Sequence, residues 1–259
     1  MNVKKFGLGL VFTMLSTLAS PLHAELSPTD KEEINKMIHQ YLTQKPEVLK
    51  EALQALQTQE WESMESATQK AILEHSDILF QSKTSPTIAP AKPTVTVVEF
   101  FDYQCKYCKK MRQDLNQFFE KNTDIRMVYK ELPVLGETSI VASKAALAAH
   151  KQNKYMDFHN RLMQEESITE QKIYEIAKEL KMNLEQLKKD MESKEIMAEL
   201  RSNIQLARDL GLRGTPALIV APYPTKVQMK SMHVPGAITA EQLNEVVTRI
   251  KTDNNTQIN

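Results

Sequence analysis

Apolar side chains in the first 80 residues recur every three to four positions, the spacing of one face of a helix. One such stripe follows Ser27 and Thr29, either of which can cap a helix, and a second begins at Pro46, a residue suited to a first helical turn. A weaker third segment covers residues 61–80. Helices this short leave more apolar surface than they can bury among themselves. They are expected to dock on the rest of the chain or on a second copy, and we favour a homodimer or homotrimer built through residues 25–80.

The pattern changes after a proline-rich stretch. Residues 81–94, QSKTSPTIAPAKPT, contain three prolines that discourage regular structure, so this segment is predicted to be a linker. Residues 95–101, VTVVEFF, then form a mainly apolar run without strict alternation, which is typical of a strand covered on both faces. A helix from Cys105 to about Lys121 and a strand over residues 125–132 follow. This order predicts two parallel strands joined by a helix.

The remaining pattern predicts one long helical region, two strands and a closing helix, at about residues 139–210, 214–221, 227–234 and 239–250. This succession of strands and helices predicts the α/β class for the main part of the chain. The polar tail, residues 253–259, is expected to be disordered.

The first 24 residues have the layout of a secretory signal peptide. A positive start, MNVKK, precedes the apolar stretch GLGLVFTMLSTLA, and Ala24 stands at a plausible cleavage point. The apolar stretch is short for a spanning helix, although an uncleaved membrane anchor is the alternative. No cysteine follows it, so a lipid anchor is not supported. Export would place the mature chain in an oxidising compartment, the periplasm.

The charge balance gives no support to a nucleic-acid partner. The formal net charge is zero, and loss of Lys4 and Lys5 with the leader leaves 31 basic against 33 acidic side chains. This balance supports neither nucleic-acid binding nor attraction to an anionic membrane.

The only two cysteines, Cys105 and Cys108, form a CxxC pair. A zinc site needs four ligands, and the histidines supply no closely spaced pair. A c-type haem would need a histidine where Lys109 stands. A disulfide across so short a loop removes little entropy from the unfolded chain. The pattern therefore favours thiol–disulfide exchange with no cofactor and no resident metal, and copper binding by the two thiols stays as the alternative.

Cys105 is expected to be the reactive thiol. It follows a buried strand and opens a helix, so its sulfur should face unpaired backbone N–H groups and the positive end of the helix dipole. Lys106, between the cysteines, adds positive charge that favours a thiolate. We therefore expect the pKa of Cys105 to lie well below the usual value of about 8.5. Lys109, Lys110 and Arg112 are expected to form a solvated helix face.

Glu99 is the one carboxylate in the apolar run before the cysteines. A charged group in a strand covered on both faces is costly unless it is paired or protonated. Glu99 is thus a candidate proton acceptor for Cys108, the cysteine that must lose its proton to resolve a mixed disulfide. The alternative is that Glu99 stands at the end of the strand with a solvated side chain.

Three motifs resemble those of the DsbA family of thiol–disulfide oxidoreductases: EFFDY-x-CxxC after a strand, GTP before a late strand, and PGA before the last helix. The segment SKAALAAHKQNKYMDFHNRLM is similar to the first helices of that family's inserted domain. The N-terminal helices resemble the Com1/ScsC-like subgroup, whose extra N-terminal region mediates oligomerisation. The resemblance covers roughly residues 95–252 and implies a thioredoxin fold there, with an inserted helical domain at about residues 139–210 and an N-terminal helical segment before the fold.

The resemblance also implies roles for individual residues. Cys105 would be the attacking thiol, Cys108 the resolving thiol and Pro216 a cis-proline. Thr215 would then offer its backbone to an extended substrate peptide, with Tyr107 as a further substrate contact. Taken alone, Gly214-Thr215-Pro216 would also fit an ordinary turn before a strand.

Two departures from the family pattern affect these expectations. The strand after GTP, ALIVAPYPTK, has two prolines where many relatives are rich in aromatic residues, which leaves open the shape of the following turn. Lys106-Tyr107 replaces the histidine-containing pair of the strongest oxidases. We therefore expect a reduction potential below about −120 mV, the value of the strong oxidant DsbA.

The leading hypothesis is an enzyme that forms or isomerises disulfides in exported proteins and is reset by a membrane redox partner that the sequence does not identify. The copper-binding alternative draws slight support from Met229, Met232 and His233. A thiol peroxidase is a weaker third hypothesis, since only the reactive cysteine supports it.

Overall fold

A computed structural model describes the backbone of residues 27–225 and 230–255. The leader predicted over residues 1–24, Met229 and the last four residues of the predicted tail lie outside the described residues. No described helix is both long enough and apolar enough to cross a bilayer. The chain separates into two compact units, Met1–Gln57 and Thr58–Asn259.

The described part of the first unit is helical. Helix α1 (Pro28–Gln44) begins with a capping box: the Ser27 hydroxyl accepts from the Asp30 amide at 3.1 Å, and the Asp30 carboxylate accepts from the Ser27 amide at 3.0 Å. Ser27, rather than Thr29, is therefore the cap. Helix α2 (Pro46–Glu74) starts at Pro46, as predicted. Most of the large apolar side chains along α1 and the first turns of α2 are exposed, and they are Met37, Ile38, Tyr41, Leu49, Leu53 and Leu56.

The second unit is built on a five-stranded sheet in the order β1-β3-β2-β4-β5. Its strands are β1 (Thr87–Ile88), β2 (Val95–Phe101), β3 (Ile125–Glu131), β4 (Ala217–Pro222) and β5 (Met232–Pro235). β2 and β3 are parallel, as the strand–helix–strand order predicts, and the other neighbouring pairs are antiparallel. Every residue of β2 is buried, which agrees with its mainly apolar run.

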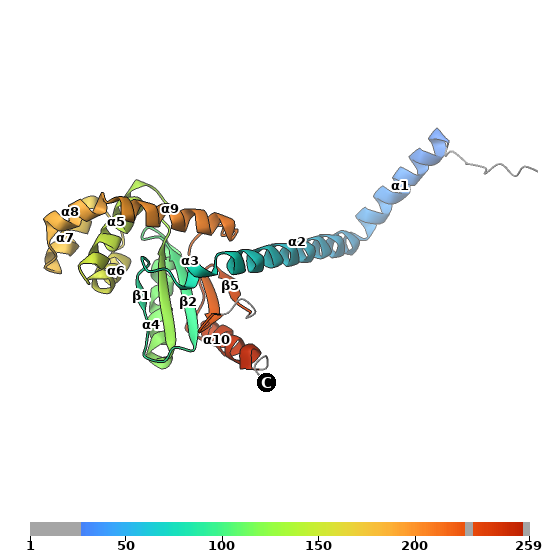
Figure 1. Ribbon diagram of the computed structural model, residues 1–259. Helices are drawn as coiled ribbons and strands as arrows, with labels where there is room; N and C mark the ends of the chain where they lie inside the picture. The colour runs from blue at the N-terminus through green and yellow to red at the C-terminus, as the bar shows by residue number, and fades with distance from the viewer. Residues whose placement is uncertain (1–26, 226–229, 256–259) are drawn as a thin grey trace, which may run out of the picture. The chain divides into compact units, whose positions relative to one another are not determined.

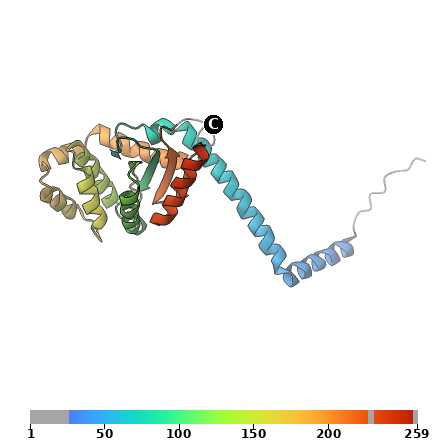
Figure 2. The same ribbon diagram turned by 90° about the horizontal axis from the view of Figure 1, so that it is seen from below.

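Helices cover both faces of this sheet. α4 (Lys106–Lys121) and α10 (Ala240–Asn255) lie side by side against one face, where Val97 and Leu218 point into the core (Figure 2). The short helix α3 (Ser76–Phe80) and the ends of α2 and α9 cover the other face, around Phe100 and Ile219. Because successive strand residues point to opposite faces, the two cores share one sheet.

The helical insertion matches the predicted region at about residues 139–210. It consists of α5 (Glu137–Lys151), α6 (Tyr155–Gln164), α7 (Glu170–Glu179), α8 (Leu184–Met191) and α9 (Lys194–Asp209). Helices α5 to α8 gather beyond one end of the sheet, and α9 runs back toward it (Figure 1). The mixed sheet with this insertion confirms the predicted thioredoxin fold.

Two boundaries differ from the sequence interpretation. The helical segment expected as one unit over residues 25–80 divides after Gln57, because its last part packs on the sheet: Leu79 is fully buried and Phe80 nearly so. The expected linker, residues 81–94, contains strand β1 at the sheet edge. Two residues are a short enough strand to fit between prolines at an edge.

A buried polar cluster fixes this segment to the sheet. The Ser85 hydroxyl donates to Glu199 Oε1 at 2.6 Å and accepts from Lys130 Nζ at 2.7 Å. Lys130 Nζ also lies 3.9 Å from Glu199 Oε1, and burial lowers the pKa of Lys130 to about 8. Pairing of this kind is what allows a lysine to be fully buried in β3.

Candidate active site

Cys105 and Cys108 lie at the start of α4, where the chain leaves β2. Cys105 has an extended backbone conformation and is the N-cap residue: its sulfur accepts a hydrogen bond from the Cys108 amide at 3.2 Å. Both thiols are free and buried, with 5% of Cys105 and 1% of Cys108 exposed. The predicted helix-end environment of Cys105 is therefore present.

The two thiols have opposite acidities. The pKa of Cys105 falls to about 6, chiefly because the Cys108 side chain hydrogen-bonds to its sulfur, with further hydrogen bonds from Thr215 and from the backbone of the helix start. The pKa of Cys108 is raised far above its usual value, chiefly by burial. The expected direction for Cys105 agrees with the structure, but the leading cause is Cys108. Lys106, the first residue of α4, is exposed to solvent.

The GTP tripeptide lies directly against the CxxC pair. The Thr215–Pro216 peptide bond is cis, as the family resemblance implies. The Sγ of Cys105 lies 3.3 Å from the carbonyl oxygen of Thr215, to which its thiol form donates. Gly236 of the PGA turn donates its amide to the Pro216 carbonyl at 2.9 Å, so all three motifs meet at one end of the sheet. Tyr107, the proposed substrate contact, is 69% exposed at the same helix start.

Glu99 lies within β2 and is 1% exposed, which excludes the alternative of a solvated strand end. Glu99 is two residues from Val97 and two from Phe101, so all three side chains point to the same face of the strand, the face covered by α4. Burial raises the pKa of Glu99 to about 7, and the Arg112 guanidinium partly opposes this rise. One carboxylate oxygen, Oε2, has no hydrogen-bond partner among the described residues. The charge on Glu99 also contributes to raising the pKa of Cys108, so the two groups interact electrostatically.

Arg112 differs from the solvated residue that its place in a charged run suggested. It stands four residues after Cys108, hence on the same face of α4, and is only partly exposed. Its guanidinium donates to the Tyr129 hydroxyl at 3.4 Å and to Asn160 Oδ1 at 2.8 Å. Tyr129 is the neighbour of Glu99 across the parallel strands. Arg112 therefore supplies the positive charge that faces the buried carboxylate. The four-residue spacing between Cys108 and Arg112 is the feature of the sequence that could have placed Arg112 on the buried face of the helix.

The second buried carboxylate, Glu131, was missed by the sequence analysis. Its oxygens accept from the hydroxyls of Tyr103 at 2.8 Å, Tyr155 at 2.9 Å and Ser143 at 2.8 Å. Tyr103 also lies 3.0 Å from His159 Nδ1. Burial raises the pKa of Glu131 to about 8 and lowers that of His159 well below its usual value. Tyr103 is the one member of this cluster that lies in a motif visible in the sequence, EFFDY. The other members come from β3 and the helical insertion, so their proximity to Tyr103 depends on the tertiary fold.

Asp102 was also missed, and it shapes the turn before Cys105. One oxygen accepts from the amides of Val134 at 2.8 Å and Leu135 at 3.0 Å, and the other from the Gln104 amide and the Ser139 hydroxyl, both at 2.7 Å. The Asp102 carbonyl accepts from the Cys105 amide at 3.1 Å. Asp102 therefore holds the CxxC turn against the loop after β3, whose Val134 and Leu135 are half exposed.

The described residues contain no group of three or more His, Cys, Asp or Glu side chains placed to hold a metal ion. Of the residues that suggested copper, Met232 and His233 lie in β5, and Met229 is outside the described part of the chain.

Comparison with known proteins places most of the second unit in one family. Residues 96–248 match the model of the DSBA-like thioredoxin domain, and residues 30–62 match that of the copper resistance protein ScsC N-terminal domain. Disulfide bond formation protein D of Bacillus subtilis is 26% identical over 152 residues, covering 53% of this chain and 68% of that protein.

Solved structures agree with these family matches. A thioredoxin-like oxidoreductase from Silicibacter pomeroyi is 37% identical, with 68% of this chain and 97% of that one covered and a TM-score of 0.63. ScsC of Proteus mirabilis in a transitional conformation is 28% identical, with coverage of 88% and 100% and a TM-score of 0.60. The second similarity extends over the N-terminal helices as well.

Proposed function

Because the chain belongs to the DSBA-like thioredoxin domain family and is a thiol–disulfide oxidoreductase, we propose that it forms and isomerises disulfides in exported proteins of the periplasm. One observation carries the proposal: the Cys105 sulfur lies at a helix N-cap, beside Cys108 and against the backbone of Thr215. A stabilised thiolate at that position is both a good leaving group and, at neutral pH, an available nucleophile.

Disulfide formation starts from the oxidised pair. A substrate thiolate attacks Cys105 Sγ, the Cys105–Cys108 bond breaks, and Cys108 leaves as a thiolate that takes up a proton. A second substrate thiolate then attacks the substrate sulfur of the mixed disulfide, and Cys105 leaves as a thiolate. Two electrons pass from the substrate dithiol to the cysteine pair. A membrane redox partner of unidentified nature would accept these electrons and restore the disulfide.

Isomerisation starts from the reduced pair. The Cys105 thiolate attacks a non-native disulfide and releases one substrate thiolate, which can then attack another disulfide of the same substrate. If the substrate stays attached, Cys108 must lose its proton and attack Cys105 to release it. The raised pKa of Cys108 makes this step unfavourable without a base. We propose Glu99 as this base, because its own pKa of about 7 and its electrostatic effect on Cys108 support a proton transfer between the two groups.

The N-terminal helices are proposed to join two or three copies of the chain. Their exposed apolar side chains, such as Ile38, Tyr41 and Leu53, have no cover within the described chain. The match to the ScsC N-terminal domain over residues 30–62 falls on the same helices. Several active sites in one assembly would suit the reshuffling of misfolded substrates, so we favour isomerase or mixed activity.

Removal of the N-terminal helices tests this proposal. A chain that begins at Thr58 keeps the whole second unit, whereas a chain that begins after residue 80 would lose part of its core. The chain that begins at Thr58 should be monomeric by light scattering. It should lose most of its ability to refold a substrate with scrambled disulfides. It should keep its reaction with a simple dithiol. An unchanged oligomer, or a monomer with full refolding activity, would contradict the oligomer model.

Trapping of substrates tests the enzymatic role itself. Cys108→Ala removes the resolving thiol, so mixed disulfides between Cys105 and exported proteins should accumulate in the periplasm and should be absent in Cys105→Ala. If the pair instead served to hold copper, Cys108→Ala would chiefly abolish copper uptake and would trap no protein.

A further inference from the structure

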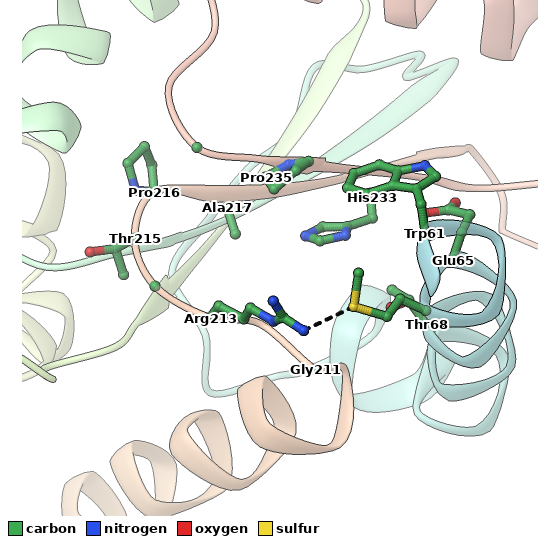
Figure 3. Close-up of a pocket in the computed structure, with 13 residues that line it drawn as sticks. Trp61, Glu65, Thr68, Gly211, Arg213, Thr215, Pro216, Ala217, His233 and Pro235 are labelled. Carbon is green, nitrogen blue, oxygen red and sulfur yellow. Dashed lines mark hydrogen bonds between the residues drawn. The ribbon is translucent and has the colours of Figure 1, made fainter. Parts of the chain in front are cut away.

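A cavity of about 280 Å³ opens beside the GTP loop (Figure 3). Ala217, which lines it, belongs to the core on the face of the sheet away from α4. The last turns of α2 form one wall, through Trp61, Met64 and Thr68. The loop from Gly211 to Ala217 and the end of β5 form the rest. The cavity belongs entirely to the second unit.

The α2 wall is fixed to the rest of this unit by specific contacts. The Thr68 hydroxyl donates to the Leu210 carbonyl at 3.2 Å. Gln69 donates to the Ser231 carbonyl at 2.8 Å and accepts from the Ser231 hydroxyl at 3.1 Å. These bonds join α2 to the loop that leads to the GTP tripeptide and to the residue before β5. The cavity is therefore built by the fold of the second unit.

The lining of the cavity is mostly apolar and rich in flat or polarisable groups, and Glu65 and Arg213 bring one charge of each sign to it. Trp61 is 55% exposed and Met64 38% exposed, which is unusual for side chains of their size. In Figure 3, the imidazole of His233 points into the space between Trp61 and Arg213. Burial lowers the pKa of His233, which favours the neutral form of the ring. Rings, prolines and a thioether favour an aromatic occupant over a charged one.

Arg213 adds to the same preference. Its guanidinium contacts the Met64 sulfur at 3.0 Å and lines the cavity from the loop before the GTP tripeptide. A planar cation beside an apolar wall binds the face of an aromatic ring. The volume is just below the usual range for a drug-sized ligand, about 300–1,000 Å³, and suits one large side chain.

Thr215 lies next to both the cavity and the reactive sulfur. It lines the cavity, and its carbonyl oxygen lies 3.3 Å from Cys105 Sγ. An extended peptide advances about 3.3 Å per residue, so a residue within about three positions of a cysteine attached to Cys105 can reach the cavity.

We propose that this cavity receives an aromatic side chain of the substrate polypeptide, located within about three residues of the cysteine that bonds to Cys105. The proposal rests on the thiol–disulfide exchange proposed above and adds a preference among substrates. It also gives the end of α2 a second role, because the helix that leads from the N-terminal region would select the substrate.

Single-cysteine peptides of one scaffold test the preference. Each peptide carries phenylalanine at one position from three residues before to three residues after the cysteine, and the reference peptide has alanine throughout. With the oxidised full-length protein, at least one phenylalanine peptide should react at least tenfold faster than the reference. Equal rates for all peptides would overturn the pocket assignment while leaving disulfide exchange intact. No reaction with any peptide would instead contradict the proposed function.

Substitutions in the α2 wall of the cavity test whether the cavity causes the preference for phenylalanine peptides. Trp61→Ala and Met64→Ala should each reduce the ratio of the phenylalanine to the alanine rate to about threefold or less. Leu73→Ala is the matched control, because Leu73 is a large apolar residue of α2 with 40% exposure that does not line the cavity. It should keep the full ratio. A ratio that survives both Trp61→Ala and Met64→Ala would overturn the proposal.

Trp61 is the only tryptophan of the chain, so its fluorescence reports on the cavity directly. In Cys108→Ala, a mixed disulfide with the preferred phenylalanine peptide should shift the Trp61 emission to shorter wavelength, and the alanine peptide should not. Emission that depends on protein concentration, and not on the attached peptide, would assign the cavity to contacts between copies and would exclude the proposal.

Discussion

The sulfur of Cys105 lies 3.3 Å from the carbonyl oxygen of Thr215, although 110 residues separate the two along the chain. The contact joins the CxxC turn after β2 to the loop before β4. β2 and β4 are antiparallel neighbours, with Phe100 opposite Ala217, so the end of one strand meets the start of the other. The reactive sulfur and the backbone proposed to hold its substrate are thus positioned by the same sheet.

The first prediction concerns the acidity of Cys105. Titration of thiolate absorbance in the reduced protein should show one group with a midpoint near pH 6, and Cys108 should stay protonated up to alkaline pH. Cys108→Ala should move the midpoint of Cys105 to higher pH, because it removes the hydrogen bond that lowers this pKa most. Lys106→Ala should have a much smaller effect, since Lys106 is exposed. A larger shift for Lys106→Ala than for Cys108→Ala would contradict this explanation.

The second prediction concerns the cost of the buried charge on Glu99. Its pKa is about 7 in the folded protein against about 4.5 for an ordinary glutamate, so the folded state binds the extra proton and loses stability as pH rises from 4.5 to 7. Glu99→Gln removes this loss. Its free energy of unfolding should exceed that of the wild type by up to about 3 kcal/mol at pH 8, with little of this gain at pH 4. Denaturant unfolding at the two pH values measures it, and a gain independent of pH would contradict it.

The third prediction assigns the positive charge that acts on Glu99. Arg112→Met should raise the pKa of Glu99 further, because the guanidinium lowers it. The carboxyl signal of Glu99, followed by NMR across the pH range, should therefore titrate at higher pH. Tyr129→Phe is the control: it removes the 3.4 Å hydrogen bond but keeps the guanidinium, so the shift should be smaller. Equal shifts in both variants would show that the hydrogen bond, and not the charge, is responsible.

The fourth prediction places residues 76–80 in the core of the second unit. Leu79→Ala should lower the free energy of unfolding by about 2–5 kcal/mol, because Leu79 is fully buried. Its neighbour Ile78 is 41% exposed on the same short helix, so Ile78→Ala should cost much less. Chemical denaturation of the chain starting at Thr58 measures both. Similar small effects would mean that α3 does not contribute to this core.

Local patterns were sufficient for much of the fold. The change from helical spacing to the mainly apolar run at residues 95–101 located β2, and Pro46 located the start of α2. The spacing of Cys105 and Cys108 after that strand identified the reactive pair and the direction of the pKa of Cys105. These features depend on neighbours within a few residues, which is why the sequence reveals them.

The misassigned residues depend on neighbours that are distant in sequence. Arg112 has the composition of a solvated helix face, yet it contacts Asn160 of the helical insertion and Tyr129 of β3. Residues 81–94 have the composition of a linker, yet Ser85 bonds to Lys130 and Glu199. In both cases a buried partner on another element decides where a polar side chain lies.

The sequence by itself therefore determined the order of the main strands and helices, the reactive CxxC pair and the family resemblance. Only the tertiary structure decided that Glu131, Tyr103 and His159 form one buried cluster, and that the end of α2 lines a cavity beside Thr215. The physical reason is the distance along the chain between the residues that interact. Helix and strand spacing follows from local backbone geometry, whereas a cluster or a cavity exists only when the sheet brings together elements that are far apart in the chain.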